Sequence, residues 1–124
     1  PPLMPVDPVT RAHFRLALFR IETDWYRLAE EIEEASEKKQ ATRSRKMLKE
    51  SILQSADVFA AREFFLSDEF SLVDASIAPI LWRLPVYNID ISTKSGAIEA
   101  YMDRIFARSS FQQSLTEREQ EMRL

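Results

Sequence analysis

The apolar residues of this chain recur at the spacing of an α-helix rather than that of a β-strand. Between residues 14 and 32 they step by three and four positions, which places them on one side of a helix: Phe14, Leu18, Ile21, Trp25, Leu28 and Ile32. Runs that alternate apolar and polar residues are nearly absent, and the 124 residues include one glycine, Gly96. The sequence therefore predicts an all-α bundle of about five helices without a sheet.

The first of these helices has a marked start and two apolar faces. Asp7 and Pro8 are the residue types preferred at an N-cap and at the first helical position, and the pattern continues to about Ala35. Opposite the core stripe lie further apolar residues, including Leu16, Phe19 and Tyr26. We expect these three to form a domain or dimer interface; a neighbouring helix of the same domain is the alternative.

Two later helix starts carry a capping box, in which a hydroxyl and a carboxylate three residues on bond each other's backbone N–H groups. Ser71 and Asp74 form one such pair, and we assign them a structural role at the start of a buried central helix. Thr116 and Glu119 form the second, which opens a short final segment. Further helices are expected from about residue 37 to 59 and from 95 to 108.

Charge is segregated near the middle of the chain. The acidic run "EEIEEASE" is followed at once by the basic run "KKQATRSRKMLK", in a chain of 17 basic and 20 acidic residues. The preferred interpretation is a solvated helical hairpin with local ion pairs, and the alternative is a patch that docks an acidic protein or nucleic acid. The net charge of −3 gives no overall attraction to nucleic acid.

Catalytic and metal-binding patterns are missing from the sequence. There is no cysteine, His13 is the single histidine, and the four glutamates Glu30, Glu31, Glu33 and Glu34 lack a histidine at helical spacing. One glycine cannot make a phosphate-binding loop. No apolar run is long enough to span a membrane. From its residues we expect a non-enzymatic chain without metal or cofactor.

The segment "FFLSDEFSLVDASIAPILWRL", residues 64–84, resembles the signature of the all-helical C-terminal domain of glutathione transferases. "PLMPVDPVTRA" and "YMDRIFARSSFQQSL" are similar to the linker and the late helix of that family. The resemblance implies a single helical domain over 1–124, with a linker remnant at 1–8, the bundle at 9–124, and the N-terminal thioredoxin-like domain absent from this chain. Ser67 stands where the family usually has a turn glycine.

A narrower resemblance concerns the stringent starvation protein A family, through "PPLMPV", "IETDWY", "APILWRLP" and the tail "SLTEREQEMRL". It implies a cytoplasmic bacterial stress-response regulator that binds RNA polymerase holoenzyme including its primary sigma factor. It also implies a homodimer, or a heterodimer with a paralogue, and no sequence-specific nucleic-acid binding. The family's protein-binding pocket maps to Pro1, Pro2, Leu3 and Met4, and Asp7 stands where close relatives are expected to have an aromatic residue.

Two other functions remain open. The parent protein could be a glutathione transferase or thiol reductase whose second-substrate wall includes Phe14, Trp82 and Tyr87. The third option is a scaffold module of translation complexes. The resemblance is specific as to fold and much less so as to function.

Overall fold

The computed structural model describes residues 4–91 and 95–123, and every regular element in these ranges is helical. The elements are α1 (Pro8–Arg20), η1 (Ile21–Tyr26, a π-helix), α2 (Arg27–Glu34), α3 (Lys38–Gln54), α4 (Ala56–Ala61), α5 (Leu72–Trp82), α6 (Gly96–Phe106), α7 (Ser109–Ser114) and α8 (Glu117–Glu121). The β-type backbone pairing in the described ranges is limited to one isolated bridge between Phe64 and Ser67. The all-α prediction is confirmed.

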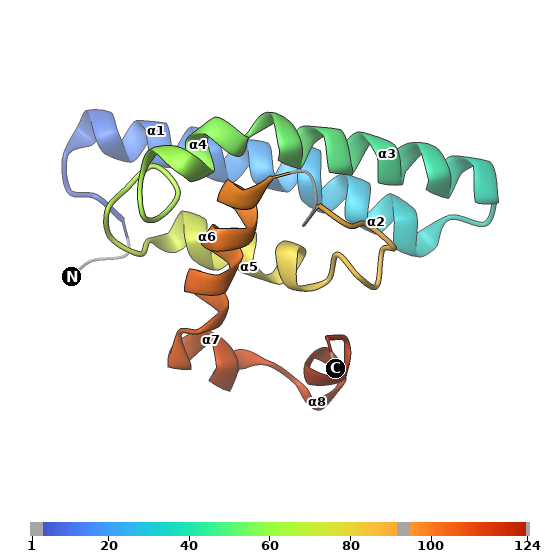
Figure 1. The fold of residues 1–124 in the computed structure, drawn as a ribbon. Helices are drawn as coiled ribbons and strands as arrows, with labels where there is room; N and C mark the ends of the chain where they lie inside the picture. Colours follow the sequence, from blue (N-terminus) through green and yellow to red (C-terminus); the bar gives the residue numbers. More distant parts are fainter. Residues whose placement is uncertain (1–3, 92–94, 124) are drawn as a thin grey trace.

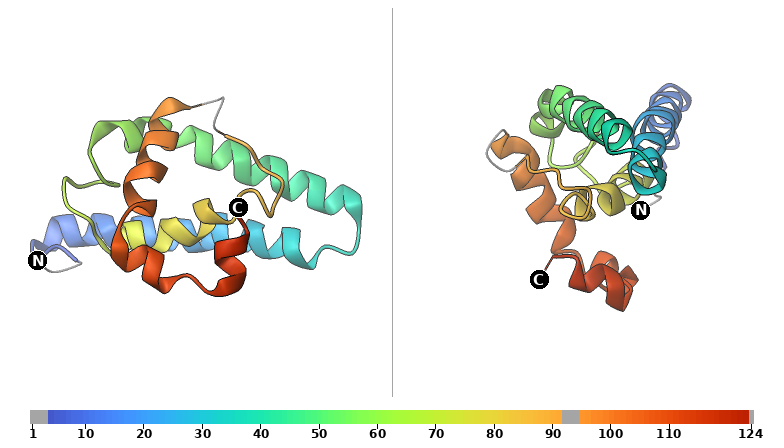
Figure 2. Two further views of the ribbon diagram at one scale, coloured as in Figure 1. Left: turned by 60° about the horizontal axis from the view of Figure 1, so that its bottom comes forward. Right: turned by 90° about the vertical axis from the view of Figure 1, so that its right-hand side faces the viewer.

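Three segments follow one another without a break to make the first long helix of Figure 1, which is α1, η1 and α2. α3 and α4 return alongside this rod, and α5 lies against its α1 and η1 segments, as the two views of Figure 2 also show. α6 crosses α5, and α7 and α8 form a separate layer at the C-terminal end. None of the helices within the described residues is long and apolar enough to cross a lipid bilayer.

The predicted stripe of the central helix α5 is buried. Val73, Ile77 and Ile80 lie within α5, and Leu84 lies just beyond its end. The second predicted helix is divided, because Ser55 has φ −88° and ψ 5° and separates α3 from α4. Its expected core residues Leu48, Ile52 and Phe59 are buried, whereas Ala41 and Ala56 are half-buried. α7 was not predicted, since "SSFQQS" carries no apolar period.

The turn before α5 contains Ser67, which stands where the family usually has a glycine. Ser67 does not have a positive φ; the positive φ of 64° belongs to Leu66. Ser67 instead pairs with Phe64 through backbone hydrogen bonds of 2.9 and 3.4 Å. The turn is therefore of another type, in which the strained backbone lies one residue earlier and on a non-glycine residue.

Candidate protein-binding site

A groove of about 390 Å³ lies where the N-terminal segment meets the loop between α4 and α5. We call it the linker groove; its lining residues are Met4, Pro5, Thr10, Phe14, Arg62, Leu66, Ser67, Glu69, Phe70 and Ser71. Of the four residues predicted for the protein-binding pocket, Met4 lines this groove. Pro1, Pro2 and Leu3 lie outside the described residues. The sequence reasoning missed the loop side of the groove, although the loop directly precedes the capping box that had been found.

The α1 side of the linker groove is fixed by the helix cap. The Asp7 carboxylate accepts hydrogen bonds from the Thr10 backbone N–H at 2.9 Å and from the Thr10 hydroxyl at 2.8 Å. Both bonds lower the pKa of the Asp7 carboxyl, and the bond from the Thr10 backbone N–H has the larger effect. Asp7 therefore serves α1 rather than the groove wall, which is formed on this side by Thr10 and the buried ring of Phe14.

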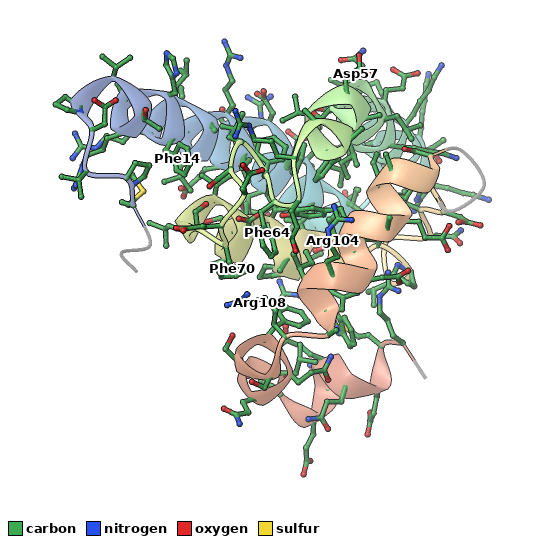
Figure 3. All side chains as sticks on the ribbon, turned by 60° about the vertical axis from the view of Figure 1, so that its left-hand side comes forward. Phe14, Asp57, Phe64, Phe70, Arg104 and Arg108 are labelled. Carbon is green, nitrogen blue, oxygen red and sulfur yellow. The ribbon has the colours of Figure 1, made fainter. Side chains whose placement is uncertain are left out.

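Aromatic and cationic side chains support the loop side. Phe70 meets Phe64 edge to face with 5.8 Å between ring centroids. The Arg108 guanidinium lies over the Phe70 ring at 3.9 Å, and Figure 3 shows Arg108 reaching these two rings from beyond the end of α6. Arg104 on α6 donates from Nε to the Glu63 carbonyl at 2.8 Å. The loop is thus held by α6 and by the residues that follow it.

A buried carboxylate anchors the same loop from below. Asp74 accepts hydrogen bonds from the Phe65 N–H (2.9 Å), the Ser71 N–H (2.9 Å), the Ser71 hydroxyl (3.3 Å) and the Tyr101 hydroxyl (2.6 Å). Burial and the neighbouring Asp74 raise the pKa of Tyr101, so this tyrosine stays a hydrogen-bond donor. Ser71 and Asp74 form both bonds of the capping box, and Asp74 in addition joins the loop, α5 and α6.

The chemistry of the linker groove suits a protein ligand. Met4, Phe14 and Phe70 give it apolar surface, while the exposed Arg62 and Glu69 add one charge of each sign. Non-obligate protein interfaces likewise combine apolar and polar surface. Within the part of the chain that the structure describes, no three His, Asp or Glu residues are grouped to hold a metal ion.

The three predicted interface residues do not share one face. Leu16 and Phe19 are 49% and 65% exposed. Leu16 lines a second groove, of about 420 Å³, together with residues of α3 and α4. Tyr26 is half-buried and donates its hydroxyl to the Ser76 carbonyl of α5 at 2.7 Å. The wider π-helical turn between Phe19 and Tyr26 changes the helical phase, which the 100° spacing used on the sequence did not anticipate.

The second-substrate wall proposed as an alternative is not assembled. Phe14 lines the linker groove, whereas Tyr87 lines a different cavity beside Tyr26 and Arg83. Burial and a hydrogen bond to Glu33 raise the pKa of Tyr87 to about 12. Trp82 is covered by the C-terminal segment: its Nε1 donates to the Glu119 carbonyl at 2.6 Å.

The C-terminal segment is held by more than its capping box. Arg83 and Glu119 form an ion pair of 3.1 Å. Arg123 donates to the carbonyls of Leu81 (3.1 Å) and Trp82 (2.9 Å) at the C-terminal end of α5, where carbonyls lack their full helical partners. The sequence showed the box but gave no signal for these contacts, since the partners are more than 30 residues apart.

Much of the charged hairpin is exposed, as the preferred interpretation expects, and Glu31 pairs locally with Arg27, but among the described residues no ion pair joins its acidic run to its basic run. The ion pairs found among the described residues join Arg27 to Glu31, Arg62 to Asp68 and Arg83 to Glu119. None joins the glutamates of α2 to the cations of α3. Glu31 accepts from the Ser44 hydroxyl, and Glu33 accepts from the Tyr87 hydroxyl. The Glu31 carboxylate is thus shared between Ser44 and Arg27, and that of Glu33 is bound by Tyr87 of the 85–91 loop.

Comparison with known proteins begins with the fold. The bacterial glutathione transferase BphK in a ternary complex superposes with a TM-score of 0.83 at 22% identity, over 98% of this chain and 60% of that one. The Tau class enzyme of mango, Mangifera indica, gives 0.78 at 18% identity over the same shares. At such identities the likeness concerns the fold alone.

Sequence relatives are closer. Proteins named stringent starvation protein A homolog are 47% identical in Haemophilus ducreyi, 49% in Histophilus somni and 40% in Coxiella burnetii. These alignments cover 93%, 94% and 99% of this chain but 54%, 55% and 59% of the relatives. The chain thus spans little more than half their length. The predicted resemblance to these proteins is confirmed.

The sequence model of one family, the glutathione S-transferase C-terminal domain, matches residues 13–109. This range includes α1 from His13 onward, the capping box of α5 and all of α6, while α7 extends beyond it and α8 lies outside it. The chain therefore belongs to the glutathione S-transferase C-terminal domain family.

Proposed function

We propose that this chain is the protein-binding helical domain of a bacterial transcription regulator that associates with RNA polymerase, and that it carries no catalytic group of its own. The names of the relatives support the assignment. The resemblance to stringent starvation protein A implies binding to the holoenzyme with its primary sigma factor. A cytoplasmic location and a role in the stress response follow from the same proposal.

The linker groove is the observation that carries this proposal. Met4, the described member of the predicted pocket, lies in a groove of mixed lining, in which the apolar side chains of Phe14 and Phe70 stand beside hydroxyl groups and single charges at Arg62 and Glu69. A proline-rich segment such as residues 1–5 loses little conformational entropy on binding, which favours its use as a protein contact. We assign Pro1, Pro2, Leu3 and Met4 to the polymerase-facing surface on this basis.

The exposed residues of α1 support a second contact. Leu16 and Phe19 are large apolar residues left open to solvent, and Leu16 belongs to a groove of its own. We propose this face as the contact with a second copy, a paralogue or the upstream domain. Tyr26 contributes less, because its hydroxyl is already bound to α5.

Capture of RNA polymerase holoenzyme by the full-length protein tests the proposal. Replacing Met4 and Phe70 by alanine should remove apolar surface from the linker groove and reduce capture by at least about tenfold, as two interface side chains of this size together contribute more than about 1.4 kcal/mol. Pro1→Ala with Pro2→Ala should reduce it further.

Met47→Ala is the matched control, since Met47 is 47% exposed on α3, away from the linker groove. Capture unchanged in every groove variant would remove these residues from the binding site. Retention of the same protein on glutathione resin, together with unchanged polymerase capture, would favour the transferase alternative.

A further inference from the structure

The outer side of α3 is a continuous basic surface. Residues 38–49 include six cations and no acidic residue. We call the members without a hydrogen-bonded partner the basic face: Lys38, Lys39, Arg43, Lys46 and Lys49, of which all but the half-buried Lys49 are exposed. The sixth cation, Arg45, is excluded because its Nε donates to the Tyr87 carbonyl at 2.7 Å.

These cations are not neutralised by the domain. Within the described residues, the ion pairs all lie elsewhere, and the nearest acidic helix, α2, directs Glu31 to Ser44 and Glu33 to Tyr87. Glu37 and Glu50 flank the basic face at its two ends. The uncompensated charge therefore remains available to an anionic partner.

The helix also sets the spacing of the charges. At 100° per residue, Lys39, Arg43 and Lys46 point within about 35° of one direction, opposite the buried Leu48. The whole basic face extends about 16 Å at 1.5 Å per residue. Figures 1 and 2 show α3 along an outer edge of the molecule, so a long, rigid partner can approach it.

We propose that the basic face binds the phosphate backbone of double-stranded DNA without reading its sequence. A row of 16 Å corresponds to about five base pairs at 3.4 Å per phosphate along each strand, enough for three or four phosphate contacts. This inference stands independently of the polymerase assignment, because it uses other residues on another helix.

An acidic protein fits the basic face less well. The centres of protein interfaces are enriched in aromatic residues and depleted in lysine, and four of the five residues here are lysines. The basic face contains no aromatic residue at all. A charge-only surface matches the sequence-independent term of DNA binding, in which affinity comes from the release of counterions.

Binding of the full-length protein to a fluorescein-labelled 20-bp duplex of arbitrary sequence, measured by anisotropy from 25 to 200 mM salt, tests the proposal. We expect dissociation constants in the micromolar to 100 μM range, and a slope of log K against log salt of about −3 to −4. An A·T-rich and a G·C-rich duplex should bind equally, since no base edge is contacted.

Arg43→Gln with Lys46→Gln should make the slope of log K against log salt less negative by about 2 and weaken binding roughly 50-fold at 0.1 M salt. The matched control is Arg11→Gln with Arg118→Gln, which removes the same charge from two exposed arginines on α1 and α8. The control should bind within about threefold of the unaltered protein.

Three results would overturn the proposal. The first is an equal loss of duplex affinity in the control variant, which would show that the effect comes from the net charge of the protein and not from the basic face. The second is the absence of binding at 25 mM salt. The third is tighter binding of a labelled polyglutamate peptide than of the duplex at the same salt, which would assign the basic face to an acidic protein.

Discussion

The two capping boxes of this chain have the same sequence pattern and very different surroundings. Ser71 and Asp74 lie in the core, where Asp74 is 0% exposed and accepts four hydrogen bonds. Thr116 and Glu119 lie near the C-terminus, where Thr116 is exposed and Glu119 bonds to Thr116 and Arg83. Both boxes start a helix, but only the first also connects a loop and two helices.

This difference shows that the local motif and its energetic weight are separate properties. The hydroxyl-x-x-carboxylate pattern needs only a helix start, and both sites provide one. How much each contributes depends on which other donors reach the carboxylate and on whether water can replace it when it is removed. Substitution of the two carboxylates, and of the turn before the first box, measures this directly.

The largest effect is expected at the buried box. Asp74→Ala leaves the Phe65 N–H and the Tyr101 hydroxyl buried without an acceptor, so the free energy of unfolding should fall by about 3 to 5 kcal/mol. Urea unfolding followed by circular dichroism measures this loss. Tyr101→Phe removes one of the four donors and should lower the free energy of unfolding by about 1 to 2 kcal/mol. A loss below about 1 kcal/mol in Asp74→Ala would mean that water enters and replaces the carboxylate.

A smaller effect is expected at the exposed box. Glu119→Gln removes the charge that pairs with Arg83 and weakens the cap, so the free energy of unfolding should fall by about 1 kcal/mol or less. Hydrogen exchange of the amides of residues 116–123 should quicken, while that of α5 stays unchanged. Equal quickening in α5 would show that the C-terminal segment supports the core and would contradict the comparison.

The same site predicts a dependence on pH. The Thr116 N–H, with Arg83, lowers the pKa of Glu119 below the ordinary value of 4.5. A carboxyl whose folded pKa is lowered stabilises the folded state above its unfolded pKa, and this contribution is lost as the pH falls through the folded pKa. Protection of the C-terminal amides should therefore decrease below about pH 4.5 in the unaltered protein and show a smaller pH dependence in Glu119→Gln.

The smallest effect concerns the turn that leads into the buried box. Leu66→Gly should relieve up to about 1 kcal/mol of left-handed strain, offset in part by the lost side chain, which is 37% exposed. Ser67→Gly should give no gain, because Ser67 does not have a positive φ. Thermal unfolding of the two variants distinguishes them. A higher melting temperature for Ser67→Gly than for Leu66→Gly would show that the strain is placed wrongly.

Local features of the fold were predictable from the sequence, and so was part of the candidate site. The cap at Asp7, the box at Ser71 and the buried stripe of α5 depend on neighbours within four residues, so spacing alone located them. Met4 was assigned to the protein-binding pocket by resemblance, and it lines the linker groove. Arg62 and Glu69 on the far wall of the linker groove were missed, because they come near Met4 only through the folded loop.

Longer-range arrangements could not be predicted in this way. The π-helical turn at residues 21–26 rotated Tyr26 toward α5, which a constant 100° per residue does not allow for. No ion pair joins α2 to α3 among the described residues; Ser44 and Tyr87 are the partners that Glu31 and Glu33 bind across the fold. The same outcome left the basic face without partners.

The sequence by itself determined that this chain is helical, where its capped helices α1, α5 and α8 begin and which apolar stripes face the core, because helix periodicity and capping act over one or two turns. The tertiary structure decided which of two motifs of the same hydroxyl-x-x-carboxylate pattern is buried, which cations stay unpaired and which residues share a groove. These properties depend on contacts between residues of different helices and loops, such as Glu31 with Ser44 and Tyr87 with Glu33, whose geometry is set only when the helices pack together.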